Sequence, residues 1–98
     1  MTVASDRIDK WLFHARFYRT RALAQAAAAA GRIRLNGTRV EKPAQPVRPG
    51  DILTLGRGGE ILALRVVALA LRRGPASEAR ALYEIVADGT LAPGSRPP

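Results

Sequence analysis

The sequence predicts one α+β domain, and two observations carry the prediction. Residues 6–30 show the apolar spacing and the capping residues of two short helices, whereas residues 32–69 alternate apolar runs with glycine and proline turns. With 98 residues, 47% of them hydrophobic, the chain is long enough to bury one modest core. We therefore expect a single domain over residues 1–87 and a flexible, proline- and glycine-rich tail over residues 88–98.

The first helix is expected to begin after an N-cap at Asp6 and to end near Phe17. Asp9 follows three residues after the cap, and both acids favour the positive end of the helix dipole. One face of this helix is apolar and is expected to pack in the core: Ile8, Trp11, Leu12 and Ala15. A neighbouring stripe is cationic, and its histidine ring is expected to be exposed or half-packed: Arg7, Lys10, His14 and Phe17.

The second helix is expected from Arg21 to Ala30. Thr20 is placed to cap its first turn, and the alanine run has the strongest intrinsic preference for helix. Gly31 follows directly and can adopt the left-handed conformation that ends a helix. These residues therefore predict a short two-helix hairpin.

A tight β-hairpin is expected around Asn36-Gly37, because both turn positions of such a hairpin require positive φ. A two-residue loop places Leu35 opposite Thr38 and Arg34 opposite Arg39. Like charges directly opposite one another destabilise a ladder, so the arginine pair indicates a bound anion. The side chains of Ile33, Leu35 and Val40 are expected on the apolar inner face of the hairpin. Arg34 and Arg39 are expected on the outer face, together with Arg32.

The second half of the chain predicts further strands and a last helix. Residues 42–49 are expected to form an ordered loop, and residues 48–51 a turn. Strands are expected over residues 52–55 and 60–69, joined by a glycine-rich reversal, and residues 72–75 are expected to end the sheet. Ser77 can cap a C-terminal helix, whose apolar side would hold Ala79, Leu82, Tyr83 and Val86.

Positive charge is concentrated in the first half of the chain. Residues 6–42 hold nine of the sixteen Lys and Arg residues but only three of the eight acids, and the formal net charge is +8. Fourteen of the sixteen cations are arginine, which favours bidentate contacts with phosphate and stacking on bases. Phe17 and Tyr18 alternate with arginines and can either stack on unpaired bases or pack the helix turn. A polyanion is the partner that this pattern predicts.

The residue content argues against catalysis. One histidine and no cysteine exclude a Cys–His pair and a multi-histidine metal site, and the acids lack the spacing of a metal loop or of paired carboxylates. We expect no enzymatic activity, no metal and no cofactor. No apolar run approaches the ~20 residues of a membrane span, and residues 1–7 lack the apolar region of a secretory signal. A cytoplasmic protein without a membrane partner is expected.

Several motifs in register resemble the RNA-binding domain named after protein S-four of the small ribosomal subunit. They are RIDKWL (7–12), RFYRTRALA (16–24) and the stretch from Gly31 to Asn36-Gly37, followed by VRPGD (47–51). The resemblance covers a core motif at residues 6–55. Within that family, the AR-F-Y segment (15–18) and RGPASEA (73–79) are most similar to the ribosome-associated fifteen-kilodalton heat-shock protein family.

The resemblance implies a fold, a role and a set of binding residues. The fold would be a two-helix hairpin and a β-hairpin packed on a small, mostly antiparallel sheet. The role would be a stress response at the large ribosomal subunit, in the rescue of stalled subunits that carry nascent-chain tRNA. The RNA-facing residues carried over from the family are Arg7, Lys10, Arg16, Arg19, Thr20, Arg21, Arg32, Arg34 and Asn36. Hairpin register adds Arg39. A longer basic C-terminal extension in the family is not matched here.

Three other functions remain open from the sequence. The chain could be a tRNA- or DNA-binding regulator, or the RNA-binding subunit of a separate RNA-modifying enzyme. It could also be a protein-interaction module that uses the apolar side of the C-terminal helix around Leu82 and Val86. We expect structured ribosomal RNA and tRNA-bearing nascent-chain complexes as partners, with DNA as the alternative nucleic acid, and we expect a monomer.

Overall fold

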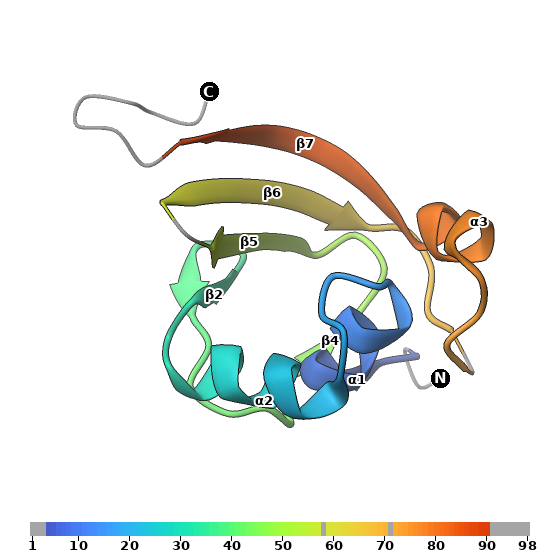
Figure 1. Cartoon of the computed structure of the whole chain (residues 1–98), viewed down its shortest axis with the longest axis horizontal. Coiled ribbons are helices and arrows are strands. Elements are labelled where there is room, and N and C mark those ends of the chain that lie inside the picture. Colours follow the sequence, from blue (N-terminus) through green and yellow to red (C-terminus); the bar gives the residue numbers. More distant parts are fainter. Residues whose placement is uncertain (1–3, 58, 71, 91–98) are drawn as a thin grey trace.

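A computed structural model describes residues 4–57, 59–70 and 72–90, and it confirms the α+β class (Figure 1). Helices α1 and α2 lie together on one side of a β-sheet, and α3 lies at one end of strands β6 and β7. In chain order the elements are β1 (Asp6–Arg7), α1 (Ile8–His14), α2 (Arg21–Ala29), β2 (Ile33–Leu35), β3 (Thr38–Arg39), β4 (Pro46–Val47), β5 (Ile52–Arg57), β6 (Glu60–Val66), α3 (Ala76–Ala79), the 3₁₀ helix η1 (Arg80–Leu82) and β7 (Tyr83–Thr90).

The main sheet has five antiparallel strands in the order β3-β2-β5-β6-β7, and a separate two-stranded ladder joins β1 to β4. The two-helix hairpin and β-hairpin expected on a mostly antiparallel sheet are therefore confirmed. The hairpin has the predicted register, with Arg34 opposite Arg39 and Leu35 opposite Thr38. Its turn residues Asn36 and Gly37 have φ values of 51° and 86°, as the Asn-Gly pair predicts.

The core lies between the two helices and the facing side of the sheet. Trp11 and Leu12 are fully buried, as expected from the apolar face of α1, and the Trp11 indole donates a hydrogen bond of 2.9 Å to the carbonyl of Ala68. The small side chains of α2 at Ala24 and Ala28 are also fully buried. Alanine at these positions lets the helix backbone approach its neighbours closely, which keeps α2 near α1.

Both ends of α1 differ from the expectation. Asp6 pairs with Val47 in the β1–β4 ladder, so the N-cap is Arg7, and no side chain caps the helix. The helix ends at His14 because Arg16 takes a left-handed conformation, with φ of 65°. The N–H groups of Arg16 and Phe17 then return to the carbonyls of Phe13 and Leu12, at 3.1 and 3.0 Å. This is a Schellman motif with arginine in the place that glycine usually occupies.

The second helix follows the prediction more closely. The Thr20 hydroxyl accepts a hydrogen bond of 3.1 Å from the N–H of Leu23, so Thr20 is the N-cap. Gly31 has φ of 76° and ends the helix, again with Schellman hydrogen bonds, while Ala30 is the C-cap. A β-carbon at Gly31 would also meet the Arg39 guanidinium at about 2.2 Å. Glycine is therefore required here both for its backbone conformation and for space.

The predicted C-terminal helix is wrong over most of its length. Helix α3 and η1 end at Leu82, and residues 83–90 form the edge strand β7 against β6. Ile85 and Val86 are β-branched and favour the strand, and the exposed edge of β6 supplies partners for its backbone. Val86 is 49% exposed, so the apolar helix face proposed around it does not exist.

The sheet consequently continues beyond residues 72–75, where it was expected to end. Strand β6 stops at Val66 and not at residue 69, while β7 runs to Thr90. Residues 88–90, which were expected to begin the tail, pair with β6 as the last part of β7. The rest of the expected tail, residues 91–98, lies outside the described residues.

Candidate nucleic-acid interface

The buried carboxylate of Asp9 joins the first turns of the two helices. Its side chain is fully buried, and it accepts two hydrogen bonds of 3.1 Å from the Arg7 guanidinium, one to each oxygen. Gln25 of α2 donates to the same carboxylate at 3.1 Å, and Arg21 approaches it at 3.6 Å. The backbone N–H of Lys10 also donates, at 2.8 Å. Asp9 thus fixes two predicted RNA-binding arginines relative to one another.

The same contacts keep Asp9 charged. Burial by itself raises the pKa of Asp9, but hydrogen bonds from Arg7, from Gln25 and from the backbone of Lys10 outweigh it and lower the pKa below its usual value. One anion here faces two cations, so the cluster retains positive charge. The side chains of Arg7 and Arg21 remain 47% and 43% exposed, which leaves part of each guanidinium open to a ligand.

Lys10 lies in the first turn of α1, and Arg16, Arg19 and Thr20 lie in the α1–α2 connection. Lys10 lies 3.8 Å from Asp6, in a partly exposed pair. Arg19 and Thr20 are exposed, although the Thr20 hydroxyl is used as the cap of α2. Arg16 is exposed and donates from Nε to the carbonyl of Gly74 at 2.8 Å. Arg16 therefore also connects this turn to the segment that precedes α3.

The hairpin supplies three exposed arginines. Arg34 contacts its own turn through the carbonyl of Gly37 at 3.4 Å, and Arg39 lies over Gly31 at the end of α2. Arg32, which precedes β2, is also exposed. The opposed pair of Arg34 and Arg39 thus stands on the surface as the hairpin register predicts, with no acidic side chain bridging it among the described residues.

Asn36 has a structural function that the sequence did not indicate. Its amide donates to the Asp51 carboxylate at 3.1 Å, and its carbonyl oxygen accepts from the N–H of Ile52 at 2.9 Å. These bonds attach the hairpin turn to the start of β5. Asn36 therefore holds the turn in place, and the residue itself remains exposed.

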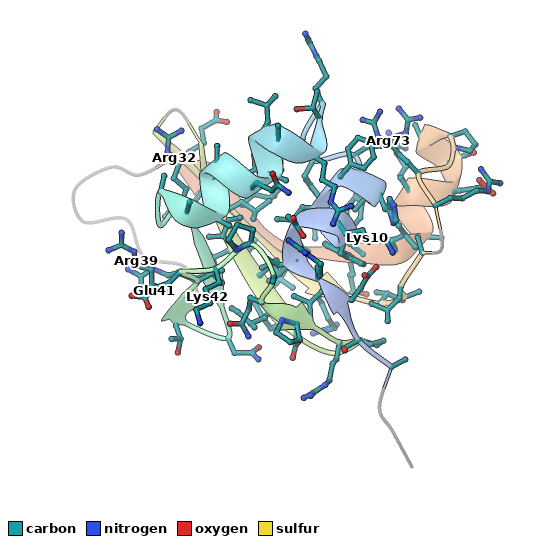
Figure 2. All side chains as sticks on the ribbon, turned by 90° about the horizontal axis from the view of Figure 1, so that it is seen from below. Lys10, Arg32, Arg39, Glu41, Lys42 and Arg73 are labelled. Carbon is teal, nitrogen blue, oxygen red and sulfur yellow. The ribbon has the colours of Figure 1, made fainter. Side chains whose placement is uncertain are left out.

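Figure 2 views the molecule from the helix side. Lys10 lies near the middle of this view, on α1, and Arg32, Arg39 and Lys42 lie toward the hairpin, with Glu41 as the acid among them. Arg73 lies on the opposite side of the view, near α3. The labelled cations of α1, the hairpin, the following segment and the stretch before α3 are therefore spread across this view from one edge to the other. Lys42 and Arg73 were not among the predicted site residues.

Arg73 could not have been found from local sequence, because its contacts are nearly sixty residues away along the chain. Its guanidinium lies 4.5 Å from the centre of the Phe13 ring. It donates to the carbonyls of Phe13 and Tyr18, at 3.1 and 3.4 Å. Arg73 therefore stabilises the turn between α1 and α2, and this turn carries Arg19.

Two aromatic expectations are resolved by packing. Phe17 stacks on Trp11 at 6.3 Å and contacts Tyr83 of β7 at 4.6 Å, so its ring belongs to the border of the core. Tyr18 is also partly buried against the core. The expectation for His14 is wrong, because the ring is only 6% exposed. The early end of α1 and the segment after β6 together enclose it.

Residues 4–57, 59–70 and 72–90 contain no cluster of metal ligands and no membrane-spanning helix. No three His, Asp or Glu side chains in that part of the chain gather as metal ligands. None of the helices described there has both the length and the apolar character needed to cross a membrane.

Comparison with known proteins agrees with this geometry. Residues 6–53 match the S4 domain family. Heat shock protein 15 of Escherichia coli K12 is 45% identical over 82 residues, which is 84% of this chain and 61% of the relative. The chain therefore spans about three fifths of the length of that relative. The RQC P-site tRNA stabilizing factor of Bacillus subtilis is 38% identical over 60 residues, covering 61% of this chain and 69% of the relative.

A solved structure extends the comparison to three dimensions. The heat shock protein 15 of Vibrio cholerae, described as trimeric, superimposes with a TM-score of 0.79 at 37% identity. The match covers 86% of this chain and 84% of the solved one, so it includes the C-terminal segment beyond the S4 domain. The chain belongs to the heat shock protein 15 family of S4-domain proteins.

Proposed function

We propose that this chain is a non-catalytic protein that binds structured RNA of the large ribosomal subunit. Its task would be the rescue of stalled subunits that still carry nascent-chain tRNA. The observation that carries the proposal is the arginine-rich unit of α1, α2 and the β2–β3 hairpin, in which Asp9 holds Arg7 and Arg21 together while both remain partly exposed. Folded RNA presents the phosphates that such a surface attracts.

The relatives support this role. The Bacillus subtilis relative is named an RQC P-site tRNA stabilizing factor, that is, a protein that stabilises tRNA in the P site. We carry that setting to this chain as part of the proposal. We also propose that the protein acts in the cytoplasm, binds as a monomer, and uses the ten candidates as its RNA contacts: Arg7, Lys10, Arg16, Arg19, Thr20, Arg21, Arg32, Arg34, Asn36 and Arg39.

Co-sedimentation with large ribosomal subunits tests the proposal. The variant Arg19→Glu/Arg34→Glu should abolish co-sedimentation with little change in melting temperature, because both side chains are exposed. The control Arg65→Glu/Arg80→Glu makes the same change of charge on exposed residues of β6 and η1, and it should still bind. Equal loss in both variants would show that net charge alone, and not this surface, controls binding.

The salt dependence of the wild-type protein gives a second measurement. If five to eight phosphates are neutralised, log affinity should fall with log salt with a slope of about −4 to −7. Competition of large subunits against tRNA and duplex DNA at one salt concentration separates the proposed function from a tRNA- or DNA-binding regulator. Tighter binding to either competitor than to the subunit would contradict the proposal.

A further inference from the structure

A cavity of about 280 Å³ lies where the end of α1 meets the segment between β6 and η1. Its wall has an apolar part from Leu69, Ala79 and Leu82 and a polar part from His14, Arg72 and Glu78. The volume is just below the ~300–1,000 Å³ of pockets for drug-sized ligands, so a smaller flat group would fit. Three of the lining residues, Gly74, Glu78 and Ala79, come from the RGPASEA segment, which lies beyond the matched S4 domain.

His14 contributes a buried imidazole ring to this wall, with 6% of the residue exposed. Burial lowers the pKa of His14 below its ordinary value. Its Nδ1 atom is buried and has no hydrogen-bond partner among the described residues. A buried polar atom without a partner is costly, so a ligand that reaches Nδ1 with a hydrogen bond would be favoured here.

Glu78 contributes two acceptor oxygens. Its carboxylate lies so close to Gly74 that a β-carbon there would be 2.2 Å from Oε2, although the φ of Gly74 is one that any residue can adopt. Glycine at this position therefore makes room for a carboxylate that is folded toward the chain. Arg72 lies 3.7 Å from the other oxygen, and both side chains are exposed, Arg72 by 72% and Glu78 by 56%, so the carboxylate stays open to a ligand.

We propose that this cavity binds an unpaired guanine base of the RNA, a proposal that rests on the RNA-binding function above. Guanine is the base whose pairing edge presents two adjacent donors, N1–H and the 2-amino group, and these match a carboxylate. Adenine would place its N1 acceptor against the same oxygens, and uracil has only one donor. The apolar wall can pack on the face of the base, and the exposed Arg72 guanidinium can stack on it or meet its phosphate.

The position of the cavity supports an RNA ligand over a protein one. Gly74, in the cavity wall, accepts the hydrogen bond from Arg16, and the neighbouring Arg73 holds the α1–α2 turn. A nucleotide in the cavity would therefore lie next to the α1–α2 turn, which belongs to the proposed RNA surface. Its phosphates would lie beside Arg16, Arg72 and Arg73.

The test uses the full chain and three heptanucleotides: 5′-UUUGUUU-3′, 5′-UUUAUUU-3′ and hepta-uridine. Fluorescence anisotropy should show about five- to tenfold tighter binding of the guanine oligonucleotide, the lower part of the range for a bidentate base contact. Glu78→Gln should remove that preference without weakening hepta-uridine. The matched control Glu84→Gln changes the charge equally on exposed strand β7 and should keep the preference.

Nuclear magnetic resonance adds a readout at the site itself. His14 is the one histidine of the chain, so its ring gives a single assignable signal, which should shift with guanosine monophosphate and not with adenosine monophosphate. Equal affinity for the three oligonucleotides, or an equal loss of the guanine preference in Glu78→Gln and Glu84→Gln, would overturn the guanine pocket. A His14 signal that shifts with a lysine-rich peptide and not with guanosine monophosphate would also overturn it, because the cavity would then bind a peptide. Salt-dependent binding to ribosomal RNA would survive that result, whereas its loss in the wild-type protein would reject the proposed function instead.

Discussion

Replacing Asp9 with asparagine should destabilise the fold by about 2–3 kcal/mol. The carboxylate is fully buried and accepts two bonds from Arg7, one from Gln25 and one from the backbone of Lys10. A hydrogen bond to a charged group contributes roughly 1.5–3 kcal/mol, and removal of one partner of a buried pair costs roughly 3–5 kcal/mol. Arg7 is about half exposed and can regain hydrogen bonds with water after the substitution. We therefore expect a cost at or below the lower end of the buried-pair range, that is, about 2–3 kcal/mol.

The amide of asparagine has nearly the same shape but presents an N–H₂ donor toward groups that are themselves donors. The midpoint of thermal unfolding should therefore fall by about 8–24 °C, since each kcal/mol corresponds to about 4–8 °C for a domain of this size. Urea unfolding followed by circular dichroism would measure the free energy. The comparison variant is Asp6→Asn, whose carboxylate lies 3.8 Å from Lys10 and accepts one hydrogen bond of 2.9 Å from the N–H of Arg7. With fewer charged partners than Asp9, it should cost about 0.5–1.5 kcal/mol, clearly less than Asp9→Asn.

The pH dependence provides the sharper check of the same reasoning. The folded pKa of Asp9 is lower than its unfolded value, so the stabilisation is complete above the unfolded pKa of about 4 and is lost as the pH falls through the folded pKa. The difference between wild type and Asp9→Asn should thus be constant from pH 7 to 5 and shrink under more acidic conditions. A difference below about 0.5 kcal/mol at pH 7, or one that persists unchanged into acid, would refute the account.

Two further substitutions test the positions that shape the interface. Gly31→Ala should lower stability by about 1–3 kcal/mol, because alanine is strained at a φ of 76° and its β-carbon would displace Arg39. Gly37→Ala, with a φ of 86° but no neighbour within 4 Å, should cost less in the same urea titration, and equal costs would exclude the Arg39 contact. Arg73→Ala should lower stability by about 1–3 kcal/mol and weaken RNA binding several-fold, because Arg73 contacts the Phe13 ring and donates to its carbonyl. Arg72→Ala is the control and should leave the stability unchanged. Equal melting temperatures of the two variants would show that Arg73 does not stabilise the α1–α2 turn.

Local chemistry was sufficient to predict the middle of the interface. Thr20 caps α2, Gly31 ends it, and Asn36-Gly37 sets a register that places Arg34 opposite Arg39. Each of these features depends on residues within about four positions of one another, so the sequence contains all the interacting parts. The resemblance to the S-four type domain then supplied the arrangement of these parts on a sheet.

The end of α1 and the C-terminal segment needed contacts that no local rule contains. Arg16 adopts a left-handed conformation that the sequence does not favour, and its guanidinium bonds to Gly74, fifty-eight positions further along the chain. Residues 83–87 have a pattern that suits a helix or a strand, and the unpaired edge of β6 decided for the strand.

The amino-acid sequence by itself determined the class of fold, the two-helix and hairpin unit, and the concentration of arginine on it, because these follow from short-range backbone preferences and from composition. Only the tertiary structure decided which of those arginines are held by the buried Asp9, why His14 is enclosed, and how Arg73 supports the α1–α2 turn. The physical reason is that burial and long-range hydrogen bonds are properties of the packed chain, and they can outweigh the local preference of any single residue.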